Sequence, residues 1–175
     1  MTTIVIVESN PAKYGQAAPQ FRDVLHQIDP SLTVRIVTPY DTPLAADAFA
    51  GADGVIFTGS AVDWNTSSPE AEPLRAAMVA ALAGERPVFG SCNGMQLAAS
   101  VLGGQVGASA SGREIAVARD VRLTAAGADH PMMAGRGSGF SVLCWHRDEV
   151  TALPPGAVVL AGNAHSGVQA MAVTG

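Results

Sequence analysis

The strongest constraint on the fold is a short turn, GSCNG at residues 90–94, which joins an apolar segment to an amphipathic one. The segment before the turn, RPVF, predicts a buried strand, and Met95 to Leu102 predict a helix that ends at two glycines. Gly-x-Cys-x-Gly between a strand and a helix is typical of a sharp turn that displays its central side chain at the carboxyl edge of a sheet. Gly90 and Gly94 lack the Cβ atoms that would clash where strand and helix crowd together. The turn therefore predicts an α/β fold in which Cys92 is displayed.

The rest of the chain agrees with an α/β fold. Apolar residues make up 48% of the sequence and charged residues 14%, which favours a sheet covered by helices over an open antiparallel sheet. The elements predicted for the first two-thirds are strands at 2–9, 31–40, 51–60 and 86–90, and helices at about 19–28, 68–83 and 95–102. Pro73 suggests that the second helix begins a few residues after 68.

The last third of the chain has a different pattern. The segments EIAVARDVRLT, FSVLCWHRDEV, GAVVLAG and GVQAMAV predict strands joined by turns, with little helix between them. We therefore predict a single domain over residues 1–175. It would be a flavodoxin-like, open, mostly parallel sheet with helices on both faces, extended by antiparallel strands in the last third.

Charge and composition exclude several functions. The net charge is −5 and the ten Lys and Arg residues are scattered, which argues against nucleic-acid binding. The first residues, MTTIVIVESN, do not resemble a signal peptide, and the apolar runs are too short to span a bilayer. Two cysteines make no disulfide framework, so we expect a cytoplasmic, reduced protein that binds no membrane. No cofactor is predicted.

The setting of Cys92 favours nucleophilic chemistry. Its sulfur would face the amino end of the following helix, where unsatisfied N–H groups stabilise a thiolate. The backbone N–H of Asn93 would point to the place where an oxyanion forms. A small buried cysteine in a glycine-rich turn is the alternative, and the spacing alone leaves both open.

Four segments resemble one known family. GSCNGMQLAASVLGG resembles the nucleophile segment of the class I (triad, Cys-type) glutamine amidotransferases, of the stand-alone GMP-synthase-amidotransferase kind. DGVIFTGSAVDWN is similar to the family's oxyanion-strand loop, and REIAVARDVRL to an intervening strand. Residues 140–173 are similar to its H-x-D-x-V, leucine-proline and V-Q-A segments. The resemblance covers nearly the whole chain.

The resemblance implies a reaction and a site. Cys92 would attack the side-chain amide of glutamine, release ammonia and form a γ-glutamyl thioester that water hydrolyses. Backbone N–H groups of Asn93 and of Gly59 or Ser60 would hold the oxyanion. The residues that the resemblance places around the bound substrate are Gly90, Gly94, Gln96, His146 and Asp148.

The general base is the weak point of this assignment. The family takes it from a His-Pro-Glu segment one strand beyond V-Q-A, whereas this sequence ends at Val173-Thr174-Gly175. We expect that segment to be missing through cloning, fragmentation or gene truncation, and the chain to be inactive or weak as it stands. His146 is the strongest substitute among four histidines, but it matches the pocket loop, and Asp148 would orient it or anchor the loop.

A metal site is a further alternative for this region. Cys144, His146 and Asp148 alternate and would share one strand face. Three ligands on one strand rarely surround a tetrahedral ion, so we predict no metal and place Cys144 in the core. Trp145 would point the other way, to the core or the rim of the pocket.

Two other functions stay open. A non-catalytic amidotransferase-like module would bind or regulate without a reactive thiol, and a γ-glutamyl peptide hydrolase would release an amine other than ammonia. The predicted partners are a small substrate, glutamine or a γ-glutamyl compound, together with a synthase partner or a second copy of the chain. Self-association would proceed through an uncovered strand edge in the last third.

Overall fold

A computed structural model describes residues 1–174, which divide into two compact units, Met1–Val101 and the part that begins at Leu102. The first unit is built on a four-stranded parallel sheet with the order β2-β1-β3-β4. Its strands are β1 (Thr3–Val7), β2 (Thr33–Val37), β3 (Gly54–Phe57) and β4 (Val88–Gly90). β1 is central, and its last three residues are fully buried, as a strand covered on both faces requires.

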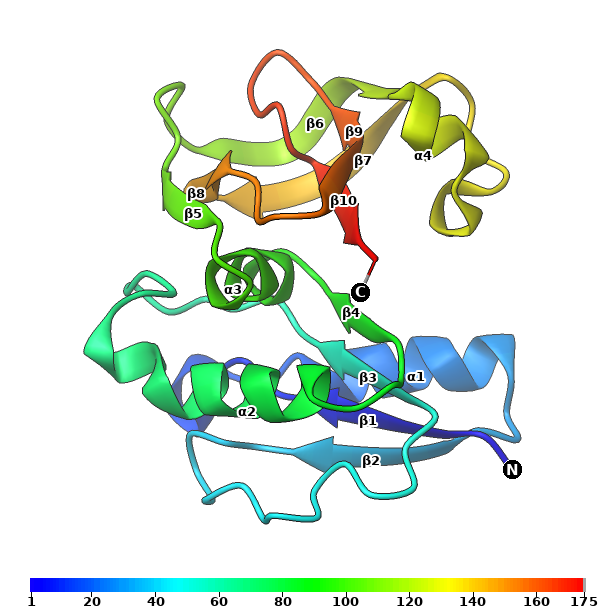
Figure 1. The fold of residues 1–175 in the computed structure, drawn as a ribbon, viewed down its shortest axis with the longest axis vertical. Coiled ribbons are helices and arrows are strands. Elements are labelled where there is room, and N and C mark those ends of the chain that lie inside the picture. Colours follow the sequence, from blue (N-terminus) through cyan, green and yellow to red (C-terminus); the bar gives the residue numbers. More distant parts are fainter. Residues whose placement is uncertain (175) are drawn as a thin grey trace. The chain divides into compact units, whose positions relative to one another are not determined.

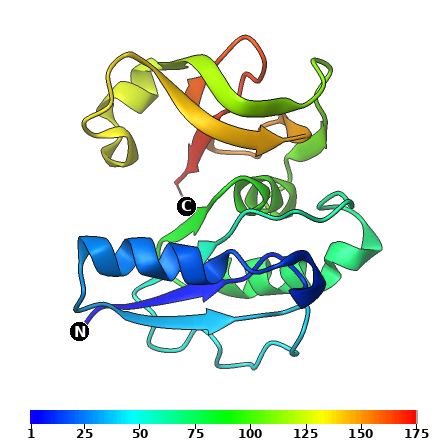
Figure 2. The same cartoon turned by 180° about the vertical axis from the view of Figure 1, so that it is seen from behind.

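Helices cover both faces of this sheet, as predicted. Figures 1 and 2 show α1 (Ala18–Ile28) on one face and α2 (Glu72–Leu82) on the other. The turn after β4 leads into α3 (Asn93–Val101), and two short 3-10 helices, η1 (Ala12–Tyr14) and η2 (Pro69–Ala71), precede α1 and α2.

The second helix begins late because of its proline. α2 starts at Glu72, which places Pro73 in the first turn, where a missing N–H costs nothing. Its buried face carries Leu74, Met78 and Ala81, which were predicted to point inward. These side chains join the main core, whose buried members are Val5, Val7, Phe49, Val55, Phe57, Leu74, Ala77, Met78, Ala81 and Leu97.

The inward face predicted for the first helix is only partly correct. Phe21 and Leu25 are half-buried, whereas Val24 is exposed and Ile28 is 76% exposed. The apolar period of a helix predicts one apolar face, but it does not say which neighbouring element will cover that face.

The second unit is antiparallel. Its larger sheet has the order β10-β9-β6-β7, and a smaller sheet pairs β5 with β8. The strands are β5 (Gln105–Ala108), β6 (Glu114–Leu123), β7 (Gly139–His146), β8 (Asp148–Ala152), β9 (Ala157–Gly162) and β10 (Ala170–Val173). The helical segments are α4 (Ala125–Asp129) and η3 (Pro131–Met133). The predicted fold class, a parallel α/β sheet with antiparallel strands in the last third, is confirmed.

Two details of this unit differ from the prediction. β5 was not predicted, and the segment at 140–150 is two strands that separate at Arg147. Asp148 therefore lies opposite Ala108 of β5, and it does not share a strand face with Cys144 and His146. The predicted grouping of these three side chains is wrong.

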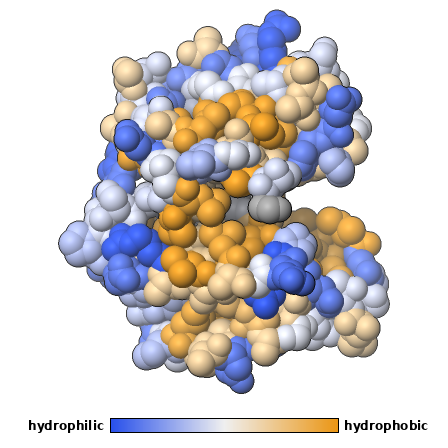
Figure 3. Space-filling model, in the orientation of Figure 1, coloured by the Kyte–Doolittle hydropathy of each residue, from blue (hydrophilic) through white to orange (hydrophobic). Residues whose placement is uncertain are grey.

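The outer face of the β6–β7 pair is apolar and exposed. Ile115 lies opposite Trp145, and Val117 opposite Leu143. Leu143 is 86% exposed and Trp145 70% exposed, so the tryptophan does not enter the core. Apolar residues gather on the visible face of each unit in Figure 3. Among the described residues, no helix is long and apolar enough to cross a membrane.

Candidate active site

Cys92 occupies a strained turn at the carboxyl end of β4. Its φ angle is 48°, a left-handed conformation that a residue with a Cβ rarely adopts. The turn is held on both sides, because Ser91 N donates to Phe57 O of β3 (2.9 Å) and Gln96 N donates to Cys92 O (3.1 Å) in the first turn of α3. The cysteine is an exposed thiol and forms no disulfide.

The two flanking glycines are required by close backbone contacts. A Cβ on Gly90 would lie 2.3 Å from the carbonyl carbon of Gly94 and 2.5 Å from Met95 N. A Cβ on Gly94 would lie 2.7 Å from Phe57 O. Real Cβ atoms do not approach backbone atoms so closely, so any larger residue forces strand and helix apart. The sequence interpretation of Gly-x-Cys-x-Gly as a sharp strand-to-helix turn agrees with these distances.

The loop that follows β3 lies beside the cysteine. A Cβ placed on Gly59 would be 3.6 Å from Cys92 Cβ, so the two backbones are neighbours. Ser60 Oγ donates to Ser9 O (2.8 Å), and Ala61 N donates to Asn10 Oδ1 (2.8 Å). Because its hydroxyl is already engaged with the loop after β1, Ser60 can offer its main-chain N–H, not its side chain, to a substrate.

A buried carboxylate holds the loop after β1 in place. Glu8 is fully buried, and its Oε2 accepts hydrogen bonds from the N–H groups of Ala17 (2.6 Å) and Ala18 (2.7 Å) at the start of α1. Its Oε1 accepts from the backbone and side-chain nitrogens of Asn10, both at 3.0 Å, and from Thr58 Oγ1 (3.3 Å). The chain segments after β1 and β3, which carry Asn10 and Gly59, are thus tied together.

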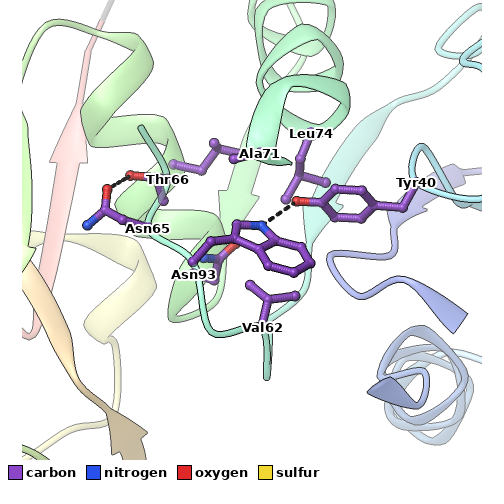
Figure 4. Close-up of a pocket in the computed structure, with 9 residues that line it drawn as sticks. Tyr40, Val62, Asn65, Thr66, Ala71, Leu74 and Asn93 are labelled. Atoms are coloured by element: carbon purple, nitrogen blue, oxygen red, sulfur yellow. Dashed lines mark hydrogen bonds between the residues drawn. The ribbon is translucent and has the colours of Figure 1, made fainter. Parts of the chain in front are cut away.

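An aromatic cluster lies at the same edge of the sheet. Trp64 Nε1 donates to the Tyr40 hydroxyl (3.3 Å), and Tyr14 and Tyr40 both meet the indole edge to face. Burial raises the pKa of Tyr40 despite the hydrogen bond from Trp64. Figure 4 shows Asn93, the first residue of α3, in the narrow crevice that this cluster lines. The crevice is tightly filled and leaves no space for a substrate.

In the second unit, the predicted residues His146 and Asp148 have separate neighbours. His146 Nε2 lies 2.9 Å from Glu114 Oε2, and Asp148 accepts hydrogen bonds from the guanidinium of Arg147. Asn163 Nδ2 and Gln169 Nε2 also donate to the Glu114 carboxylate, at 2.8 and 2.6 Å.

These contacts change the acidity of two groups. Burial acts to raise the pKa of Glu114, but the hydrogen bonds from Asn163, Gln169 and His146 outweigh it and lower the pKa below its usual value. Burial and the negative charge of Glu114 raise the pKa of the Cys144 thiol. Cys144 packs against the core of this unit, as predicted.

The structure thus collects part of the predicted site. Gly59, Ser60, Gly90, Cys92 and Asn93 lie in neighbouring loops at the carboxyl edge of the parallel sheet. With them belong Gly94 and Gln96 in the first turns of α3, where Gln96 is buried.

Sequence reasoning missed the polar anchors Glu8, Asn10 and Glu114. For Glu8 a signal was present, because it directly follows the apolar strand that begins the chain. For Glu114 no local signal exists, since its partners are 32 to 55 positions away in the sequence.

Comparison with known proteins gives a consistent family. The family model for glutamine amidotransferase class-I matches residues 22–174. A gamma-glutamyl-L-1-hydroxyisopropylamide hydrolase from a Pseudomonas species is 40% identical over 161 residues, which is 86% of this chain and 53% of that protein. A glutamine-hydrolysing GMP synthase from Thermomicrobium roseum is 39% identical over 136 residues, 78% of this chain and 24% of that protein. The chain thus spans about half of the first relative and a quarter of the second.

Solved structures agree on the fold. A GMP synthase subunit from Thermoplasma acidophilum superimposes with a TM-score of 0.81 and 22% identity, over 99% of this chain and 78% of that one. A glutamine amidotransferase from Thermotoga maritima gives a TM-score of 0.76 and 16% identity, over 98% of this chain and 71% of that one.

Proposed function

Because the chain belongs to the class-I glutamine amidotransferase family, we propose that Cys92 is a nucleophile that attacks the side-chain amide of glutamine or of a γ-glutamyl compound. The observation that carries this proposal is the geometry of Cys92 itself. An exposed thiol at φ 48°, held between glycines that tolerate no Cβ, is a costly arrangement for a residue whose role is only to pack.

The proposed reaction runs through a thioester. The sulfur of Cys92 bonds to the amide carbon, and the carbonyl oxygen takes up the negative charge of the tetrahedral intermediate. Main-chain N–H groups of Asn93 and of Gly59 or Ser60 stabilise that oxyanion, and Gln96 contacts the glutamyl group. The C–N bond then breaks, the nitrogen leaves as ammonia or an amine after protonation, and water releases glutamate.

The neighbours of His146 and Asp148 favour a supporting role. His146 Nε2 faces the carboxylate of Glu114, and Asp148 is bound by Arg147. We assign both residues to holding their segment in shape, next to the substrate as the family resemblance implies.

A γ-glutamyl amide other than glutamine is the second candidate substrate. It is favoured by the relative from Pseudomonas, whose name specifies a γ-glutamyl amide of a small amino alcohol and which matches 86% of this chain. The chemistry at Cys92 is the same in both cases, and only the leaving group differs. A non-catalytic binding module would have no use for the strained turn.

A partner is also part of the proposal. Relatives that are GMP synthases or GMP synthase subunits suggest a synthase as acceptor of the ammonia. The exposed apolar side chains of β6 and β7, with Leu143 and Trp145 the most exposed, offer a surface for that partner or for a second copy of the chain.

The proposed nucleophile can be tested without turnover. A glutamine analogue that carries a diazoketone in place of the amide should alkylate Cys92 and not Cys144, as located by peptide mass spectrometry. L-Glutamine or a γ-glutamyl alkylamide should slow the reaction, whereas D-glutamine should not. Cys92→Ser should abolish the adduct, and Cys144→Ser should leave it unchanged. Labelling that ignores both L-glutamine and γ-glutamyl amides would contradict a glutamyl-binding site.

A further inference from the structure

Three side chains of the metal-ligand type meet between β6 and β7. Glu114 lies directly opposite His146 in the strand register, and Cys144 lies opposite Ala116. Cys144 and His146 alternate with the exposed Trp145, so both point to the other, half-buried face of β7. A carboxylate oxygen of Glu114, the sulfur of Cys144 and a ring nitrogen of His146 all lie within 4.8 Å of one another.

The donor atoms suit a borderline divalent transition ion. Thiolate, imidazole and carboxylate are the ligands that zinc takes in proteins, at about 2.0 to 2.3 Å, whereas magnesium and calcium prefer oxygen alone. Donor atoms around a tetrahedral ion are therefore roughly 3.2 to 3.8 Å apart. Glu114 Oε2 and His146 Nε2 are already 2.9 Å apart, so they need only open slightly. The widest pair in the group must close by about 1 Å, which side-chain rotation supplies.

The surroundings of these three side chains are already ordered. Asn163 Nδ2 and Gln169 Nε2 donate to the carboxylate of Glu114, in the way that outer hydrogen bonds orient a metal ligand. Behind Cys144, a cluster of buried apolar side chains excludes water. Ala116, between Glu114 and the rest of β6, has a φ angle of 73°, a strained conformation of the kind found where a site imposes its geometry.

We propose that Cys144, His146 and Glu114 form a binding site for one Zn²⁺-type ion, which cross-links β6 and β7, with water as the fourth ligand. On binding, the Cys144 thiol releases its proton to solvent and the sulfur bonds to the ion. The imidazole of His146 keeps its single proton on Nδ1 and binds through Nε2, and Glu114 binds through Oε2. The set differs from the one considered from sequence, because Glu114 replaces Asp148.

Cobalt is the probe that reports the sulfur ligand. The experiment uses residues 1–175 with Cys92→Ser, so that Cys144 is the one thiol in the protein. After dialysis against a chelator, Co²⁺ should bind at one equivalent and produce a sulfur-to-cobalt charge-transfer absorption. Zn²⁺ should displace it and abolish the absorption. In the same background, Cys144→Ala and Cys144→Ser should each remove the absorption and weaken binding about 100-fold, and Glu114→Gln about tenfold.

Controls separate this site from adventitious binding. His26→Asn, a change of an exposed histidine on α1, should leave affinity and absorption unchanged. Circular dichroism of each variant identifies any that fails to fold, and two substitutions of Cys144 guard against that outcome. Binding that persists in folded Cys144→Ala, binding without the sulfur absorption, or no binding at micromolar ion would each overturn the proposal.

Discussion

Replacing Gly90 by alanine should lower the free energy of unfolding by about 3 kcal/mol. The added Cβ would lie 2.3 Å from the carbonyl carbon of Gly94 and 2.5 Å from its oxygen and from Met95 N. All three atoms belong to the backbone, so no side-chain rotation relieves the contact. The first turn of α3 must move away from β4, and the contacts of that helix with the core weaken with it.

Gly59→Ala is the matched control for Gly90→Ala. Its Cβ would lie 3.6 Å from Cys92 Cβ, an ordinary van der Waals distance, so its effect on stability should stay below about 1 kcal/mol. Urea unfolding followed by circular dichroism compares the two variants. Equal stability of Gly90→Ala and the unmodified protein would mean that strand and helix are not packed as closely as described.

Replacing Glu8 by alanine should cost about 3 kcal/mol or more, the other large effect on stability. The carboxylate is fully buried and accepts hydrogen bonds from the N–H groups of Asn10, Ala17 and Ala18. Without it, the Asn10 side chain and the hydroxyl of Thr58 also lose an acceptor. Buried donors left without a partner each carry a desolvation cost, so the loss exceeds that of one hydrogen bond.

The measurement for Glu8 has both a global and a local part. Urea unfolding gives the total loss, and Glu85→Ala, at an exposed glutamate, should change it by less than about 0.5 kcal/mol. Hydrogen exchange should accelerate at Ala17 and Ala18, whose N–H groups bond directly to the carboxylate. A Glu8→Ala protein with normal stability and normal exchange at these amides would contradict the assigned role.

The parallel unit was predictable because its signals are local. The central strand is a nearly continuous run of β-branched residues, and the Cys92 turn carries its own two glycines. Pro73 likewise indicated the late start of α2, which the structure has at Glu72.

The second unit was less predictable because its decisive features are long-range. No glycine or proline marks Arg147, where one predicted strand becomes β7 and β8. The split is set by pairing, since β7 pairs with β6 and β8 with β5. The contacts of Glu114 join residues on different strands and loops, which no window along the sequence brings together. The exposure of Ile28 has the same origin, because burial depends on the neighbouring element.

The most direct test of the central claim, that Cys92 is a displayed nucleophile, is its rate of alkylation by iodoacetamide relative to Cys144 in the unmodified protein. Cys92 is exposed at the start of α3, whereas Cys144 is partly buried and has its pKa raised by burial and by Glu114. Because the thiolate is the reacting species, Cys92 should react at least about tenfold faster at neutral pH. A timed reaction resolved by peptide mass spectrometry gives both rates. Equal rates, or earlier modification of Cys144, would contradict the account.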